Sequence, residues 1–184
     1  TWMFGIKRQL FLLLLVMLGI SGISSPAYAN VRVPAIFSDG MVLQRDKPIR
    51  VWGMAEPGEL VGVKIADQAA VCTADSRGRW GVTLRPIPYT GRSLEMVIHG
   101  KSEIVIHDVL MGEVWLCAGQ SNMGLPYRKT DYSESDTSAA NHATLRLFKL
   151  NSDESAFVPQ TDPNVHWTAS TKEDVEKFSG VAIF

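Results

Sequence analysis

The strongest constraint on the fold is a series of six short runs, between residues 49 and 109, that alternate apolar and polar residues or are rich in β-branched ones. These runs cover residues 49–53, 60–66, 69–74, 79–85, 94–100 and 103–109. Clusters of Gly, Pro, Asp and Ser separate most of them at a spacing of roughly 8–12 residues, which is typical of antiparallel β-structure rather than of βαβ units. The sequence therefore predicts a β-sandwich domain over residues 31–108.

Large apolar side chains within these runs are expected to fill the core of that domain. Trp52 and Trp80 both lie inside predicted strands, where aromatic side chains usually pack against their neighbours. A sugar-stacking role for either Trp is the alternative interpretation. Core filling is also expected of five methionines, Met41, Met54, Met96, Met111 and Met123.

The first 29 residues have the order of a secretory signal peptide. Lys7 and Arg8 precede the apolar run 10–20, and the small-x-small sequence Ala27-Tyr28-Ala29 follows. The apolar run is shorter than the roughly 20 residues that span a bilayer. We therefore expect cleavage after Ala29, export to the periplasm or the extracellular space, and no stable membrane insertion of the mature chain.

Charge and composition argue against several other functions. Eighteen Lys and Arg stand against nineteen Asp and Glu, so the chain lacks the basic excess that binds a nucleic acid backbone. Asp131, Glu134 and Asp136 form an acidic group that we interpret as a solvated face rather than a metal site, because no ligand set completes it. The sequence also lacks a glycine-rich phosphate loop, and we expect no cofactor.

The two cysteines leave two possibilities open. An oxidising compartment would allow a disulfide between Cys72 and Cys117. Cys117, however, ends an apolar run, where a free cysteine usually packs as a small hydrophobic residue. We favour free thiols.

The pattern changes after residue 108. Residues 108–119 form one long apolar run, as in a parallel strand buried on both faces. A second strand is predicted over 144–150, a loop over 151–167 and a helix over 171–184, with Thr171 as N-cap. Residues 109–184 are therefore predicted to be the start of an α/β domain.

Ser121 follows the long apolar run, at the predicted start of a helix. A strand would hold this hydroxyl rigidly at the carboxyl edge of a sheet, and the backbone N–H groups of a helix N-terminus suit an oxyanion. Gly119 would allow the sharp turn. These features favour a nucleophile for ester hydrolysis, whereas the alternative is that Ser121 only caps the helix.

The residues around Ser121 resemble a known family. "GEVWLCAGQSNM", residues 112–123, is similar to the nucleophile block of the sialate O-acetylesterases, a branch of the SGNH hydrolases. Residues 37–59, 75–88 and 178–184 also resemble parts of such proteins. The resemblance implies a β-sandwich followed by a flavodoxin-like, three-layer α/β hydrolase domain. In it Ser121 would be the nucleophile, and its neighbours Gly119, Gln120 and Asn122 would support the site.

The general base is the missing part of this site. The family supplies it from a D-x-x-H block near its C-terminus, and residues 1–184 contain no such block. His99 and His107 lie on predicted strands and have a structural interpretation, while His142 and His166 lie in loop segments and are poor candidates. We therefore expect the chain to be the N-terminal part of a longer protein and to be inactive by itself.

The reaction implied by the resemblance is hydrolysis of an O-acetyl ester on sialic acid, without a cofactor. An esterase acting on acetylxylan or another polysaccharide is the alternative enzyme, because the nucleophile block does not select the sugar. An alternative from another class is a non-catalytic, carbohydrate-binding β-sandwich protein.

The leader gives the first testable prediction. Mass spectrometry of the native purified protein should find its N-terminus at Asn30 or within a few residues of it, because signal peptidase cleaves after a small-x-small sequence. A mature protein that retains residues 10–20 would instead be anchored, and the expectation of export would be wrong.

Overall fold

The computed structural model describes residues 30–131, 142–150 and 165–183. The expected signal peptide at 1–29, Glu134 and Asp136 of the acidic group, and most of the predicted loop 151–167 lie outside the described residues. Among the residues described, no helix is long and apolar enough to span a bilayer.

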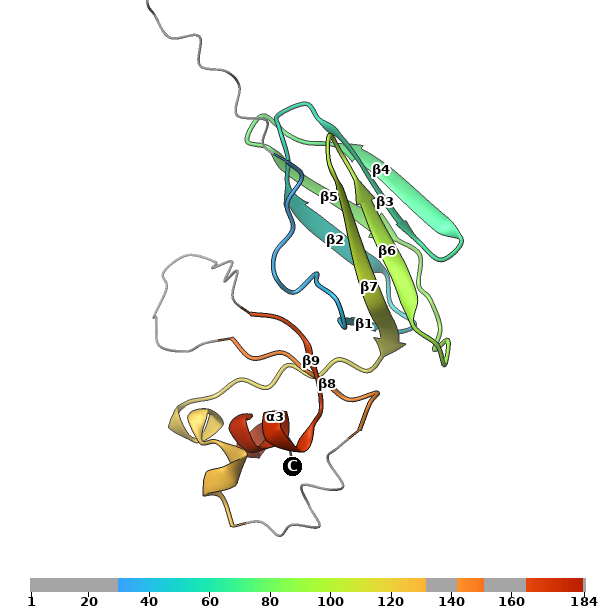
Figure 1. The fold of residues 1–184 in the computed structure, drawn as a ribbon. Coiled ribbons are helices and arrows are strands. Elements are labelled where there is room, and N and C mark those ends of the chain that lie inside the picture. Colours follow the sequence, from blue (N-terminus) through green and yellow to red (C-terminus); the bar gives the residue numbers. More distant parts are fainter. Residues whose placement is uncertain (1–29, 132–141, 151–164, 184) are drawn as a thin grey trace, which may run out of the picture.

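A five-stranded sheet contributes one layer of the first unit, in the order β1-β7-β6-β3-β4 (Figure 1). Its strands are β1 Val42–Gln44, β3 Leu60–Ile65, β4 Gln68–Thr73, β6 Leu94–His99 and β7 Glu103–Gly112. Neighbouring strands are antiparallel except β1 and β7, which run parallel, so the sheet is mixed.

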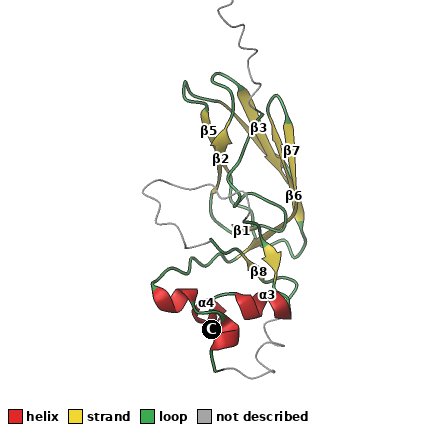
Figure 2. Cartoon of the chain, turned by 60° about the vertical axis from the view of Figure 1, so that its left-hand side comes forward, coloured by secondary structure: helices red, strands yellow, loops and turns green. Residues whose placement is uncertain are grey.

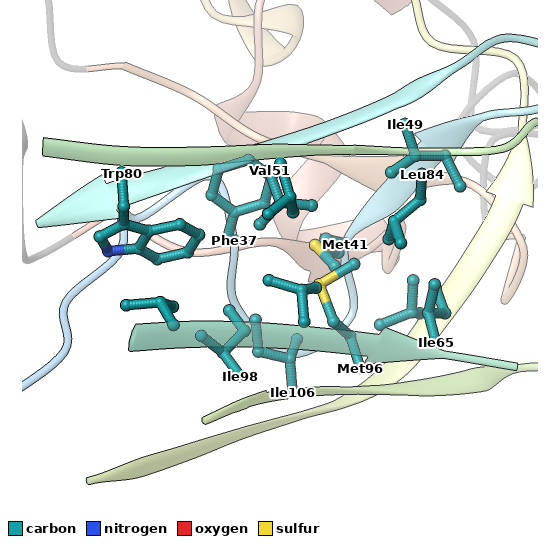
Figure 3. Close-up of a cluster of buried hydrophobic side chains, with 14 of the residues drawn as sticks. Phe37, Met41, Ile49, Val51, Ile65, Trp80, Leu84, Met96, Ile98 and Ile106 are labelled. Carbon is teal, nitrogen blue, oxygen red and sulfur yellow. The ribbon is translucent and has the colours of Figure 1, made fainter. Parts of the chain in front are cut away.

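A second, two-stranded sheet faces the first. It pairs β2 Ile49–Met54 with β5 Arg79–Leu84 in antiparallel register. Figure 3 shows Ile49, Val51 and Trp80 of this sheet opposite side chains of the larger one. The buried core between the sheets also contains Val61, Val63, Ile65, Met96, Ile98, Ile106, Val109 and Met111.

The strict alternation along β2 and β5 explains this layering. Residues 49, 51 and 53 of β2 are buried, whereas residues 50, 52 and 54 are exposed. Successive side chains of a strand point to opposite faces, so one face meets the core and the other meets solvent. The six runs identified in the sequence thus correspond to β2 through β7, and the expected sandwich is met in part, by two facing sheets of unequal size.

Three residues that the sequence places in the core lie outside it. Trp80 is buried, but Trp52 falls on the outward phase of β2 and is 42% exposed. Met54 shares that phase and is also exposed, whereas Met41, Met96 and Met111 fill the core as expected. Met123 is half-buried and lies outside this core.

The predicted strand over 108–119 is correct only as far as Gly112, where residues 110–112 pair in parallel with β1. Strand β7 crosses the expected domain boundary at 108/109 and ends at Gly112, opposite Gln44 at the end of β1. Residues 113–119 have no partner strand in the described part of the chain, so they are extended but not part of a sheet. Their apolar side chains face solvent as a result, with Trp115 85% and Leu116 93% exposed.

A second, smaller unit follows (Figure 2). It contains the 3₁₀ turns η1 Ser121–Gly124 and η2 Tyr127–Lys129, and the short antiparallel pair β8 Arg146–Leu147 and β9 Thr168–Ala169. Two short helices, α3 Lys172–Lys177 and α4 Gly180–Ile183, complete it. The described residues of this unit form no parallel sheet, and the strand predicted over 144–150 is reduced to two residues.

The helix predicted over 171–184 is present but interrupted. Thr171 is its N-cap, as expected, and its hydroxyl accepts a hydrogen bond from the Asp174 amide. The interruption at residues 178–179 has a cause in the fold: the Phe178 carbonyl accepts from the Tyr127 amide, and the Gly180 amide donates to the Leu125 carbonyl. These backbone groups pair with the segment between η1 and η2 instead of continuing the helix.

Two polar contacts join the second unit to the first. Arg146 Nη2 lies 2.5 Å from Asp108 Oδ2 at the outer part of β7. Trp167 Nε1 donates a hydrogen bond of 2.8 Å to the Ile36 carbonyl. Within the second unit, Trp167 packs against Phe148, with ring centroids 5.1 Å apart. Arg146 of β8 and Trp167, which precedes β9, therefore tie this short strand pair to the larger unit.

The ion pair between Arg146 and Asp108 generates a stability prediction. The Arg146 side chain is only 10% exposed, so Asp108→Asn leaves a largely buried cation without its counter-charge and should destabilise the fold by about 1–3 kcal/mol. Asn tolerates the left-handed backbone found at Asp108, where φ is 54°. Urea unfolding of the purified protein measures the change.

Asp46→Asn is the matched control. Asp46 has a similar φ of 58°, but its ion pair with Arg45 is 3.8 Å long and exposed, so this variant should lose less than about 0.5 kcal/mol. Equal losses in the two variants would contradict the role assigned to the Arg146 contact.

Candidate functional site

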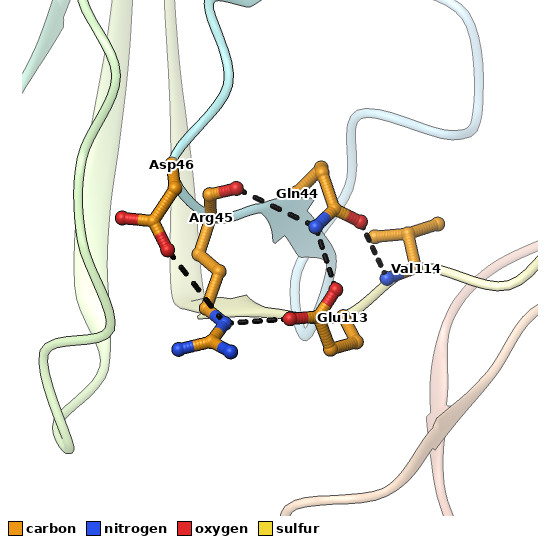
Figure 4. A network of polar contacts seen from close by, with 5 residues as sticks. All are labelled: Gln44, Arg45, Asp46, Glu113 and Val114. Carbon is orange, nitrogen blue, oxygen red and sulfur yellow. Dashed lines mark hydrogen bonds and ion pairs between the residues drawn. The ribbon is translucent and has the colours of Figure 1, made fainter.

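A polar cluster fixes the point where the chain leaves β7 toward Ser121 (Figure 4). Glu113 Oε2 accepts from Gln44 Nε2 at 2.7 Å, and Glu113 Oε1 accepts from Arg45 Nε at 2.6 Å. The Val114 amide donates to Gln44 Oε1 at 2.9 Å. Hydrogen bonds from Gln44 and Arg45 hold the pKa of Glu113 below its usual value, since they favour the carboxylate. These hydrogen bonds hold residues 113–114 beside the end of β1.

Ser121 is the first residue of η1 and is exposed. The N-cap position is occupied by Gln120, without a side-chain capping bond. The Gln120 carbonyl instead accepts from the Met123 amide at 2.9 Å. Ser121 therefore does not cap this turn in the described structure, and its hydroxyl forms no hydrogen bond among the described residues.

Gly119 lies in close contact with the Met123 side chain. A Cβ atom at this position would lie 2.6 Å from Met123 Cγ, closer than real contacts allow. Met123 in turn lies near Ser179, whose Oγ is 4.0 Å from the Met123 sulfur. The sequence motif therefore brings Gly119, the η1 turn and the start of α4 into one local packing arrangement.

A small core holds this arrangement in place. Tyr127, Leu147 and Val175 are buried together, and Phe178 and Ile183 pack against them. Gly180 lies against the same segment, where an added Cβ would be 2.6 Å from Thr130 Cγ2. The "FSG" sequence at 178–180 thus supports η1 directly. Sequence reasoning identified the resemblance of this stretch but not its contact with residues 125–130.

None of the four histidines bonds to Ser121 within the described residues. His99 Nε2 lies 2.8 Å from Glu103 on the neighbouring strand, and His107 Nδ1 lies 3.1 Å from Glu95. Both are on the exposed face of the β6–β7 pair, which fits their structural interpretation. His142 is exposed near β8, and His166 precedes β9.

His166 belongs to a shallow cavity of about 190 Å³ in the second unit. Ser121 is not among the residues that line it. Those residues come from β8, β9, α3 and their flanks: Leu147, Lys149, Val165, His166, Thr168, Asp174, Lys177 and Phe178. The cavity and the candidate nucleophile are therefore separate features.

The remaining candidates show no sign of a metal or disulfide site. Asp131 is exposed, and the described residues contain no group of three or more side chains placed to hold a metal ion. Cys72 and Cys117 are both free, as expected. The burial expected of Cys117 is wrong, because it lies in the exposed segment after β7.

The described site presents an exposed hydroxyl at the first residue of a short turn. The backbone N–H groups of Ser121 and Asn122 have no partner within that turn, whereas the Met123 amide donates to the Gln120 carbonyl. Gln120 and Asn122 flank this hydroxyl and are also exposed. A hydroxyl needs a base to become a strong nucleophile, and the described residues place none beside it.

Comparisons with known proteins agree with the resemblance of the nucleophile block. No model of a protein family matches the sequence. The sialate O-acetylesterase of Mus musculus is 26% identical over 171 residues, which cover 85% of this chain and 32% of the mouse protein. That of Homo sapiens is 32% identical over 104 residues, covering 50% of this chain and 20% of the human protein.

A solved structure extends the likeness to the fold. The crystal structure of a carbohydrate acetylesterase from Xanthomonas citri matches with a TM-score of 0.75 and 33% sequence identity. The match covers 83% of this chain and 35% of that one. The present chain thus spans about a third of the mouse and bacterial relatives. Over that span, the comparisons support the sialate O-acetylesterase family that the nucleophile block predicts, with partial coverage of its members.

Proposed function

We propose that the protein is a carbohydrate acetylesterase in which Ser121 is the nucleophile. The observation that carries the proposal is the exposed Ser121 hydroxyl at the start of η1, within the "GQSNM" sequence. The relatives named as sialate O-acetylesterases and as a carbohydrate acetylesterase support this chemistry.

In the proposed reaction, Ser121 Oγ attacks the acetyl carbonyl carbon and its proton passes to a general base. The resulting tetrahedral oxyanion is stabilised by backbone N–H groups of the turn, including that of Ser121. The intermediate expels the sugar hydroxyl, which takes up the proton, and leaves an acetyl-serine. Water then hydrolyses that ester to acetate and restores the serine.

The base is proposed to come from the D-x-x-H block that the family resemblance implies. Residues 1–184 contain no such block, and His99 and His107 are already engaged with Glu103 and Glu95. Gly119, Gln120 and Asn122 are proposed to shape the turn and to support the oxyanion site.

For the substrate, we propose O-acetylated sialic acid. The names of the mammalian relatives support this sugar, while the bacterial relative supports an acetylated carbohydrate without naming it. We also propose that the enzyme acts outside the cytoplasm, on the basis of the basic, apolar and small-residue order of residues 1–29.

The test uses the protein encoded by the longest open reading frame that contains this sequence. Ser121→Ala should lower kcat/KM for O-acetylated sialic acid by at least about 10³-fold, because loss of a triad nucleophile removes the covalent step. Acetate release from O-acetylated sialic acid, acetylated xylan and an aryl acetate measures activity and sugar preference. Stability should stay within about 1 kcal/mol, since Ser121 makes no capping bond.

Ser76→Ala, at an exposed serine in the turn before β5, is the control and should keep full activity. Substantial esterase activity in Ser121→Ala would refute Ser121 as the nucleophile. A preference for acetylated xylan over O-acetylated sialic acid would refute the proposed substrate but leave the chemistry intact.

A further inference from the structure

The outward face of β2 and β5 carries an unusual set of side chains. The pairing register places Trp52 opposite Gly81, Arg50 opposite Thr83, and Met54 opposite Arg79. Directly paired residues of an antiparallel sheet point to the same side. All six are exposed, so the two-stranded sheet presents one face with a tryptophan between basic side chains.

Basic charge extends beyond the two strands. Arg32 pairs with Met54 through an isolated bridge and lies at one end of this face. Arg85 directly follows β5 in the outward phase, beyond the opposite end. Strands β2 and β5 contain no acidic residue. The face is therefore strongly basic, although the whole chain carries a formal net charge of −1.

Most of this charge is not neutralised within the protein. Arg79 pairs with Asp75 at 2.8 Å, and hydrogen bonds from Arg79 and Arg77 hold the pKa of Asp75 below its usual value. Arg32, Arg50 and Arg85, by contrast, form no ion pair with any described residue. A guanidinium group without a protein counter-charge is free to bind an external carboxylate through two parallel hydrogen bonds.

Trp52 supplies an apolar surface at the centre of the face. It is 42% exposed, and its neighbour across the strands is Gly81, which has no side chain to cover the ring. The ring packs edge to face against the buried Phe37, with centroids 4.7 Å apart and planes at 80°. An aromatic ring that is fixed and open on one side suits the apolar face of a sugar ring.

From this combination we propose that the outward face of β2 and β5 binds a carboxylated sugar. Trp52 stacks on the pyranose ring and Arg50 binds the carboxylate of that sugar. Arg32, at the other end of the face, binds the carboxylate of a neighbouring sugar in the polymer. The choice of a sugar as ligand rests on the proposed function. The site belongs to the β-sheet unit and is distinct from the exposed Ser121 turn, so it would hold the polymer or glycan rather than perform chemistry.

Charge also argues against a second copy of the chain as the occupant of this face. A symmetric dimer uses the same patch on both subunits, which would bring unpaired arginines of one copy against those of the other. Like charges opposed at a desolvated interface are unfavourable. A ligand with negative charge fits the face better.

The experiment measures binding of the purified protein to sugar polymers that carry no O-acetyl groups. Polysialic acid and polygalacturonic acid both carry one carboxylate per sugar and distinguish sialic from uronic acids. Neutral dextran, dextran sulfate and duplex DNA are the comparison ligands. Binding to at least one carboxylated polymer should exceed binding to all three comparison ligands. Because acetate release is not involved, failure of the esterase proposal would leave this readout intact.

Two substitutions test whether Trp52 and Arg50 bind the sugar. Trp52→Ala and Arg50→Gln should each weaken binding of the carboxylated polymer by at least about tenfold, a loss of roughly 1.4 kcal/mol. Trp52→Phe, which keeps an aromatic ring, should lose less than Trp52→Ala and guards against a folding artefact. The controls are Arg92→Gln, which removes the same charge from an exposed loop, and Tyr89→Ala, which removes another exposed ring; neither should change binding.

Several results would overturn the proposal. They are absence of binding to both carboxylated polymers, equal or tighter binding of dextran sulfate or DNA, and unchanged affinity in folded Trp52→Ala. Light scattering that shows a dimer in the wild type and a monomer in Trp52→Ala would assign the face to a second copy instead.

Discussion

The described structure depends on the period-two alternation of the strands between residues 49 and 112. In β2 and β5 exposed positions alternate with buried ones, and the inward side chains of the two facing sheets form a single core. Burial of these side chains is the main favourable term in folding. Burial of this set also determines which side chains stay exposed to solvent. The same register that buries Val51 and Trp80 forces Trp52 and the arginines of β2 and β5 onto the open face.

Beyond Gly112 this constraint ends, because β1 and β6 offer no further backbone partners to β7. The hydrogen bonds that Gln44 and Arg45 donate to Glu113 set the direction in which the chain leaves the sheet. The following residues are apolar but exposed, and they lead to Ser121 at a turn that packs against α4. The fold therefore positions the candidate nucleophile through the second unit's small core around Tyr127 rather than through a continuous strand.

The sequence predicted the parts of the molecule that follow from local pattern. Alternation located all six strands from β2 to β7, and Thr171 marked the start of α3 because an N-cap needs few residues to be recognised. Prediction failed where the outcome depends on distant partners. The run 108–119 has the composition of a buried strand, yet pairing stops at Gly112. The predicted helix is broken at Phe178 because residues 125–127 compete for its backbone groups.

The same distinction applies to function. The "GQSNM" sequence pointed to Ser121 as the candidate nucleophile and to the family resemblance, because a short motif carries that information locally. Packing of Met123 against Gly119, packing of Gly180 against residues 125–130 and the basic face around Trp52 arise only from tertiary contacts or strand register. Trp52 was expected in the core because residue type alone does not reveal the phase of its strand.

The central claim is that Ser121 is the attacking group, and covalent labelling tests it most directly. The protein from the longest open reading frame is incubated with a fluorophosphonate, which phosphonylates activated serines, and its peptides are then mapped by mass spectrometry. The account predicts one adduct on Ser121, absent in Ser121→Ala and reduced by prior incubation with O-acetylated sialic acid, which occupies the same serine. An adduct on another serine, or esterase activity that persists without labelling of Ser121, would contradict it.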